Sequence, residues 1–133
     1  MAAPGFASVA GGNVRPKRFV KLTGVDNTFA ECGAGDQVAG ISGCGTRNPP
    51  YASLDDGFIA IAGETFPVFG PTEVVPLVAG AAINAGERLK SDSAGRGTPV
   101  TANNDQYGAV ALQDASGAGV EILVRVECGV HGA

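Results

Sequence analysis

The residues best suited to acid–base chemistry lie together in one stretch of the sequence, residues 85–95. This stretch, AGERLKSDSAG, places Glu87 and Asp92 among two basic residues and two serines. A catalytic pair needs a neighbour that shifts a pKa or supplies a nucleophile, and a calcium loop needs further acidic or amide ligands after Asp92. Neither is present. An aspartate followed by Gly95 is instead typical of a turn, in which the carboxylate accepts backbone N–H groups. We therefore predict two turns around a short strand.

The single histidine and the three cysteines form no strong catalytic or metal motif. His131 is two residues from the end of the sequence, and no G-x-S-x-G nucleophile motif occurs. Cys128 and His131 make a C-x-x-H pair, but Cys32 and Cys44 are twelve residues apart, whereas zinc sites usually have two close ligand pairs. We expect no enzyme activity, no metal and no cofactor.

The elements that would position these residues are predicted to be short β-strands. The 133 residues include 21 glycines and 8 prolines, and glycine costs about 1 kcal/mol relative to alanine within a helix. Residues 120–126, VEILVRV, alternate as a half-buried strand does. Pro67 and Pro76 lie in two further apolar segments, which places those segments at sheet edges or bulges. The composition therefore favours an all-β fold.

Charge, apolar runs and the start of the sequence narrow the range of partners. The net charge of −4 argues against nucleic acid as the main partner, and no apolar run is long enough to span a membrane. The first residues show no signal-peptide pattern, so we expect the cysteines to be reduced.

An internal repeat relates two parts of the chain, approximately 9–62 and 78–126. A shift of 69 aligns Val9-Ala10-Gly11 with Val78-Ala79-Gly80 and preserves a Lys…Asp-Gln spacing of 15, at Lys21 and Lys90. Residues 57–61 then match 119–123 at a spacing of 62, which predicts a loop longer by seven residues at 45–51. We expect one domain over 19–133, a small β-barrel or sandwich of jelly-roll or β-tulip-like type, or an open barrel, built from two related halves.

The basic residues are concentrated near the beginning of the sequence. Arg15, Lys17, Arg18 and Lys21 all precede the first acidic residue, Asp26. Because residues 1–18 are rich in Gly and Ala, they are predicted to form a flexible N-terminal arm that docks on an acidic partner; a solvated basic surface is the alternative.

The ordered set of these segments resembles the capsid cement, or head decoration, proteins of tailed phages. The resemblance covers roughly residues 14–127. It is carried by segments 18–22, 38–43, 85–95, 105–112 and 119–126.

The resemblance implies a structural virion protein without enzyme activity. Such proteins bind the outer surface of the expanded icosahedral capsid, commonly as trimers, and clamp adjacent major capsid subunits. For this chain it implies the major capsid protein and further copies of itself as partners, with no nucleic acid and no membrane. It also implies a position on the outer surface of the virion, after assembly in the host cytoplasm.

The residues expected to contact the capsid come from the arm and from the longer loop. A stiff Pro-Pro element followed by an aromatic residue orders at low entropic cost on binding. The candidates are Arg15, Lys17, Arg18, Pro49, Pro50 and Tyr51. Deletion of residues 2–14 is predicted to abolish capsid binding and leave the fold intact. A ligand- or glycan-binding β module, such as a virion adhesin or a β-clip domain, is the main alternative, followed by an enzyme.

Overall fold

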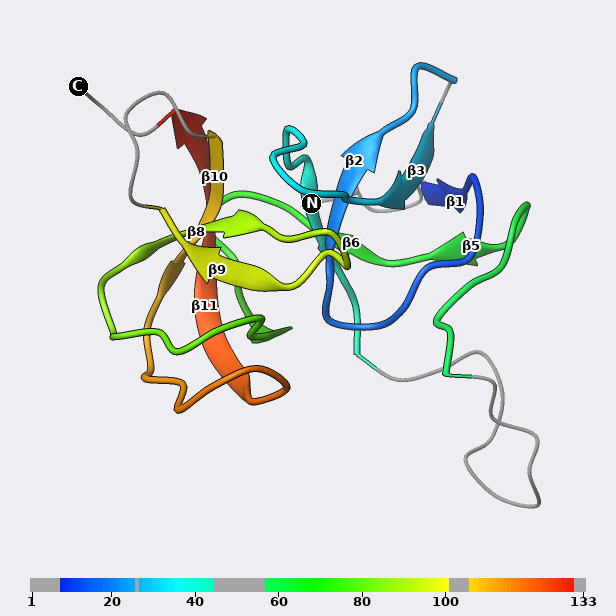
Figure 1. Ribbon diagram of the computed structural model, residues 1–133. Helices are drawn as coiled ribbons and strands as arrows, with labels where there is room; N and C mark the ends of the chain where they lie inside the picture. Colours follow the sequence, from blue (N-terminus) through cyan, green and yellow to red (C-terminus); the bar gives the residue numbers. More distant parts are fainter. Residues whose placement is uncertain (1–7, 26, 45–56, 101–105, 131–133) are drawn as a thin grey trace.

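The computed structural model describes residues 8–25, 27–44, 57–100 and 106–130. Within these ranges all regular structure is β-strand, which confirms the predicted all-β class. The described residues contain eleven strands in two sheets, which lie side by side in Figure 1. No helix in the described part of the chain is long and apolar enough to cross a membrane.

The first sheet has six strands and nearly closes into a barrel. Its strand order is β5-β1-β3-β2-β4-β6. The strands are β1 (Ser8–Ala10), β2 (Phe19–Leu22), β3 (Thr28–Glu31), β4 (Gly40–Ser42), β5 (Thr65–Phe66) and β6 (Val68–Phe69). The two edge strands, β5 and β6, are consecutive pieces of one segment joined at Pro67, so the sheet curves back onto itself.

The second sheet has five strands in the order β7-β11-β10-β8-β9. The strands are β7 (Val74–Val78), β8 (Arg88–Ser91), β9 (Gly97–Pro99), β10 (Gln106–Ala111) and β11 (Glu121–Val130). Its edges approach each other at a parallel bridge between Ala79 and Gly97, where the Gly80 N–H also donates to the Gly97 carbonyl at 2.8 Å. Pro76 lies in the edge strand β7 and Pro67 at the junction of β5 and β6, as predicted for residues that cannot donate to a ladder.

The spacing of 69 residues relates strands of the two halves. A shift of 69 aligns β2 with β8, and it aligns the first residue of β3 with the first residue of β9. The bend before β2 has a positive φ of 59° at Lys17, and the equivalent bend before β8 has φ 92° at Gly86. The two halves therefore repeat in their bends as well as in their strands.

The predicted spacing of 62 for the last part of the repeat is wrong. Val9 pairs with Thr65 in the first half, and Val78 pairs with Glu121 in the second, so the closing strands are related by 56 residues. The first half is therefore longer by thirteen residues, not seven. The sequence match failed because pairing with β1 and β7 sets the register of the closing strands, and apolar alternation alone fits several registers.

The core joins the two halves. The larger apolar cluster contains Phe19, Cys32 and Ile41 from the first half together with residues of β7, β8, β10 and β11, among them Leu77 and Val124. A smaller cluster lies within the first half alone and includes Val14, Val20 and Phe66. Because side chains of both sheets share one core, the orientation of one sheet relative to the other is fixed by packing.

The prediction of a flexible arm over residues 1–18 is wrong for residues 8–18. Strand β1 pairs with β3 on one side and β5 on the other, and the fully buried Val14 bridges to Ala60. The Gly- and Ala-rich composition suggested flexibility, but the apolar side chains of this segment are needed to fill the first barrel. Residues 1–7 lie outside the described residues.

Candidate functional site

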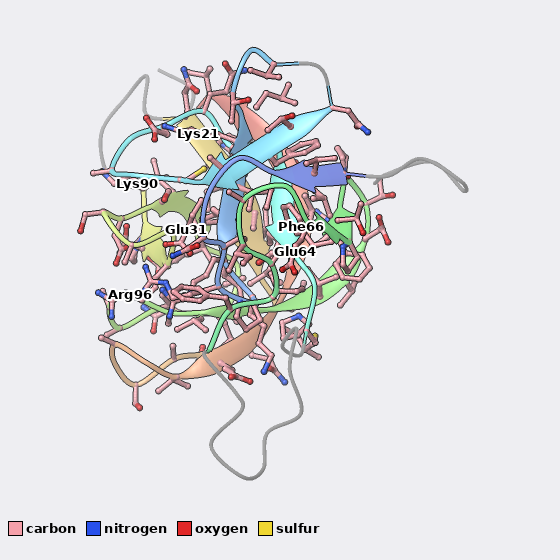
Figure 2. All side chains as sticks on the ribbon, turned by 90° about the vertical axis from the view of Figure 1, so that its right-hand side faces the viewer. Lys21, Glu31, Glu64, Phe66, Lys90 and Arg96 are labelled. Atoms are coloured by element: carbon pink, nitrogen blue, oxygen red, sulfur yellow. The ribbon has the colours of Figure 1, made fainter. Side chains whose placement is uncertain are left out.

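Arg15 joins the first sheet to the turn between β8 and β9. Its guanidinium forms an ion pair with Glu31 of β3, and its backbone N–H donates to the same carboxylate at 3.0 Å. Its Nη2 also donates to the Ala94 carbonyl of the second half at 3.3 Å. The hydrogen bond to Glu31 raises the pKa of Arg15. Figure 2 shows Glu31 close to the turn that carries Arg96.

Arg18 makes a second connection to the same turn. Its Nη1 donates to the Ala94 carbonyl at 2.9 Å, and the next residue, Phe19, donates its N–H to the Gly95 carbonyl at 2.8 Å. Burial lowers the pKa of Arg18, and the positive charge of Arg15 adds to this effect. Two arginines therefore converge on one carbonyl of the turn.

The turn itself is organised by Asp92. Its carboxylate accepts hydrogen bonds from the Ala94 N–H at 2.8 Å, the Arg96 N–H at 2.9 Å and the Arg96 Nε at 2.9 Å. Burial opposes ionisation of Asp92, but these hydrogen bonds outweigh burial and lower its pKa. Gly95 has φ 75°. The predicted turn is confirmed, and its carbonyl groups face the first sheet.

Glu87, the other carboxylate of the 85–95 stretch, also anchors a turn. It accepts the Asn84 N–H at 2.6 Å, before the bend at Ala85-Gly86. The two carboxylates that suggested acid–base chemistry therefore each stabilise a backbone turn at opposite ends of β8.

Lys17 makes the third contact between the halves. Its Nζ lies 2.9 Å from both carboxylate oxygens of Glu121 in β11, and its carbonyl accepts the Val78 N–H at 3.0 Å. All three basic residues predicted to contact the capsid thus bind groups of their own chain. Capsid binding by Arg15, Lys17 and Arg18 stays a prediction. The other candidates, Pro49, Pro50 and Tyr51, lie outside the described residues, as does His131.

Sequence reasoning missed the partners of these basic residues. Glu31, Ala94 and Glu121 lie 16, 79 and 104 residues from the side chains that they bind. A different ion pair did have a signal in the sequence, the repeated Lys…Asp spacing of 15. In the first half it is an ion pair between Lys21 and Asp36 at 2.8 Å. In the second half the equivalent aspartate, Asp105, is outside the described residues.

The Lys21–Asp36 pair lines a groove between the two halves. The groove has a volume of about 450 Å³, and its other walls include Val38, Pro71 and Cys128. Hydrogen bonds from Lys21 and from the Gly33 N–H lower the pKa of Asp36, and the bond to Asp36 raises the pKa of Lys21. This groove combines charged and apolar groups in one concave surface.

The cysteines differ in their surroundings. Burial raises the pKa of Cys32 to about 12, so its thiol is an inert part of the shared core. Cys44 and Cys128 are exposed and unpaired. Among the residues with described positions, no three histidine, cysteine or acidic side chains gather in a group that could hold a metal ion.

Comparison with solved structures and with protein families identifies the fold and the family. The crystal structure of the head fiber gp8.5 N base in bacteriophage phi29 is similar, with a TM-score of 0.57 and 18% sequence identity over 92% of each chain. No curated protein matches the sequence significantly. The family model described as phage cement protein matches residues 8–126, which is most of the sequence. The chain therefore belongs to the phage cement protein family.

Proposed function

We propose that this protein binds the outer surface of the expanded icosahedral capsid as a homotrimer and cements adjacent major capsid subunits. The family match over residues 8–126 is the observation that supports the proposal most directly. Its activity is binding, without catalysis or a cofactor.

The junction between the two halves suits a cementing role. A protein that clamps two capsid subunits must transmit force between its contact surfaces, which requires that those surfaces keep a fixed relation. Arg15, Lys17 and Arg18 connect the first half to the Asp92 turn and to β11, over a shared apolar core. Many copies on one lattice reinforce one another, so each contact can be weak.

The capsid contacts are proposed to come from the residues before β1 and from the longer loop with Pro49, Pro50 and Tyr51, and Arg15, Lys17 and Arg18 remain candidates. Because residues 8–18 belong to the fold, deletion of residues 2–14 would remove β1 and Val14 and damage the first barrel. Deletion of residues 2–7 leaves β1 in place and is the appropriate test of the arm. Replacement of Tyr51 by alanine tests the longer loop.

Co-sedimentation with expanded, undecorated shells tests the proposal. We expect saturable binding near one trimer for each threefold or quasi-threefold position of the lattice. Deletion of residues 2–7 and the Tyr51→Ala substitution should each weaken binding while circular dichroism stays unchanged. Absence of saturable binding by the intact protein would overturn the proposal. Wild-type binding by both variants would instead exclude these segments as the contacts.

The groove between the halves supports a second candidate function, ligand binding. Ligand sites are commonly concave, mostly apolar and lined by a few converging polar groups. Lys21, Asp36 and Gln37 provide such groups beside Val38 and Pro71. Calorimetric titration with a set of neutral and anionic oligosaccharides tests this candidate. Binding that is lost in Lys21→Met would support it, and no heat of binding with any of them would exclude glycan recognition.

A further inference from the structure

The second sheet presents an apolar surface on the side that faces away from its core. In β11 the side chains of Ile122, Val124 and Val126 are buried, so those of the intervening residues point outward. One of these outward residues is Leu123, which pairs with Pro76 of β7. Leu112, directly after β10, donates its N–H to the Leu123 carbonyl at 3.0 Å and so lies on the other side of Leu123. An apolar row thus runs from β7 across β11 to the end of β10.

A second row lies next to the first and has a basic residue at its centre. Arg125 of β11 pairs with Val110 of β10 on one side and with Val74 of β7 on the other. Val78 of β7, opposite Glu121, extends the apolar surface at one end. We call this surface the outer face. Its apolar members are Val74, Pro76, Val78, Val110, Leu112 and Leu123.

The outer face leaves large apolar side chains in water. Val74, Leu112 and Leu123 are 53%, 44% and 41% exposed, and they are three of the six exposed large hydrophobic residues among those described. In a half-buried strand the outward positions are normally polar, as Glu121 and Arg125 are. An apolar group at such a position gains about 25 cal/mol for each Å² that a partner covers.

Charged side chains of both signs lie on and beside the outer face. They include two ion pairs, Lys17 with Glu121 at 2.9 Å and Arg125 with Glu127 at 2.8 Å, and the exposed Arg88 of β8, which pairs with Val110. The whole chain has a net charge of −4, so two copies repel each other at long range. Through the outer face, however, each copy can place a cation against an anion of the other. This complementarity favours a further copy of the same chain as the partner.

The dimensions of the outer face suit the centre of an interface. With about 4.8 Å between strands and about 3.4 Å for each residue, three strands over residues 121–127 cover roughly 14 by 20 Å. A stable interface buries about 800 Å² on each partner, so this part of the sheet, polar positions included, supplies roughly a third of that area. The Lys17–Glu121 pair then lies where interfaces are normally polar, at the rim, whereas Arg125 lies near the centre.

We propose that copies of this protein contact one another through the outer face. The number of copies rests on the proposed function: in a trimer, the outer face of each copy is directed toward the threefold axis, and Leu123 lies in the contact. In this arrangement the remaining surfaces of each copy stay available for contact with the capsid.

Sedimentation velocity across a range of protein concentrations tests this proposal. The test variant is Leu123→Lys, which places a charge beside Arg125 in the centre of the outer face. The matched control is Val25→Lys, because Val25 is 65% exposed and lies in the first half, away from the face. We expect the wild-type protein and the control to assemble, and Leu123→Lys to sediment as a monomer with an unchanged circular dichroism spectrum. If Leu123→Lys fails to fold, Val74→Lys takes its place, because Val74 is more exposed.

Two results would overturn the proposal: a wild-type protein that is monomeric throughout, or variants at Leu123 and Val74 that keep the wild-type mass. If such a variant keeps its mass but loses binding to shells, the outer face contacts the capsid instead. An assembly of two copies supports the outer face and contradicts the trimer of the proposed function. Assembly without any shell binding supports the outer face and contradicts cementing.

Discussion

Asp92 accepts three hydrogen bonds within its own turn, and the carbonyl groups of that turn accept hydrogen bonds from Arg15, Arg18 and Phe19. The turn was predictable from sequence because an aspartate followed by glycine is a local pattern. Its partners were not, because they lie more than seventy residues away and no local pattern encodes such a contact. Asp92, which suggested acid–base chemistry, thus organises a turn that holds one half of the chain against the other.

Replacement of Asp92 by asparagine should make stability less dependent on pH. Because its pKa is lowered in the folded protein, the carboxylate stabilises the fold above its unfolded pKa of about 4, and this contribution is lost as the pH falls through the lower, folded value. We expect Asp92→Asn to reduce the free energy of unfolding at pH 7 by about 1–2 kcal/mol. Urea denaturation at pH 7 and pH 3 should show the difference shrinking at the lower pH. An equal difference at both values would contradict the role of the charge.

Gly95 provides a second test of the turn. Its φ of 75° disfavours any side chain, and a Cβ there would lie 3.0 Å from the Glu31 Cγ and 3.2 Å from the Phe19 carbonyl oxygen. Gly24 also has a positive φ, 88°, but a Cβ there meets nothing within 4 Å. We expect Gly95→Ala to lower the free energy of unfolding by about 1–3 kcal/mol more than Gly24→Ala does. Equal losses in the two variants would show that the neighbouring Glu31 and Phe19 impose no steric limit on a side chain at position 95.

At the scale of elements, strand positions were more predictable than strand partners. The alternation in residues 120–126 and the positions of Pro67 and Pro76 marked a half-buried strand and two sheet edges, and the spacing of 69 related β2 to β8. The parallel pairing of β1 with β3 has no signal in the sequence, so composition alone predicts residues 8–10 to be part of a flexible arm. The spacing of 56 between the closing strands was missed for the same reason, since it is set by pairing across the barrel.

Closure of the first barrel depends on a close approach between β4 and β6. A Cβ at Gly40 would lie 2.6 Å from the Phe69 carbonyl oxygen and 2.7 Å from the Val68 Cγ1, which only movement of the backbone can relieve. We expect Gly40→Ala to lower the free energy of unfolding by about 1–3 kcal/mol, measured by urea denaturation. Gly12→Ala is the control, because a Cβ at Gly12 meets nothing within 4 Å. A Gly40 variant as stable as this control would contradict the tight closure.

At the scale of the whole molecule, the chain is a structural, capsid-associated phage protein. This family was predictable from the sequence because the order of several weak segments, taken together, is more specific than any one of them. The contacts within the chain were not predictable. The basic residues near the start of the sequence suggested a capsid-binding arm, which stays a prediction, and the structure adds that they bind Glu31, Ala94 and Glu121 within the chain. The outer face becomes visible only when Leu112, Leu123 and Pro76 are brought together by strand pairing.

The proposed strengthening of the capsid by bridging of its subunits is tested most directly by the dissociation temperature of expanded shells. A ligand that binds the assembled state and not the separated subunits stabilises the assembled state. Undecorated shells should therefore dissociate at a higher temperature once the protein has been added to saturation, and the increase should follow occupancy. Shells that bind the protein to saturation and dissociate at the same temperature as bare shells would contradict cementing.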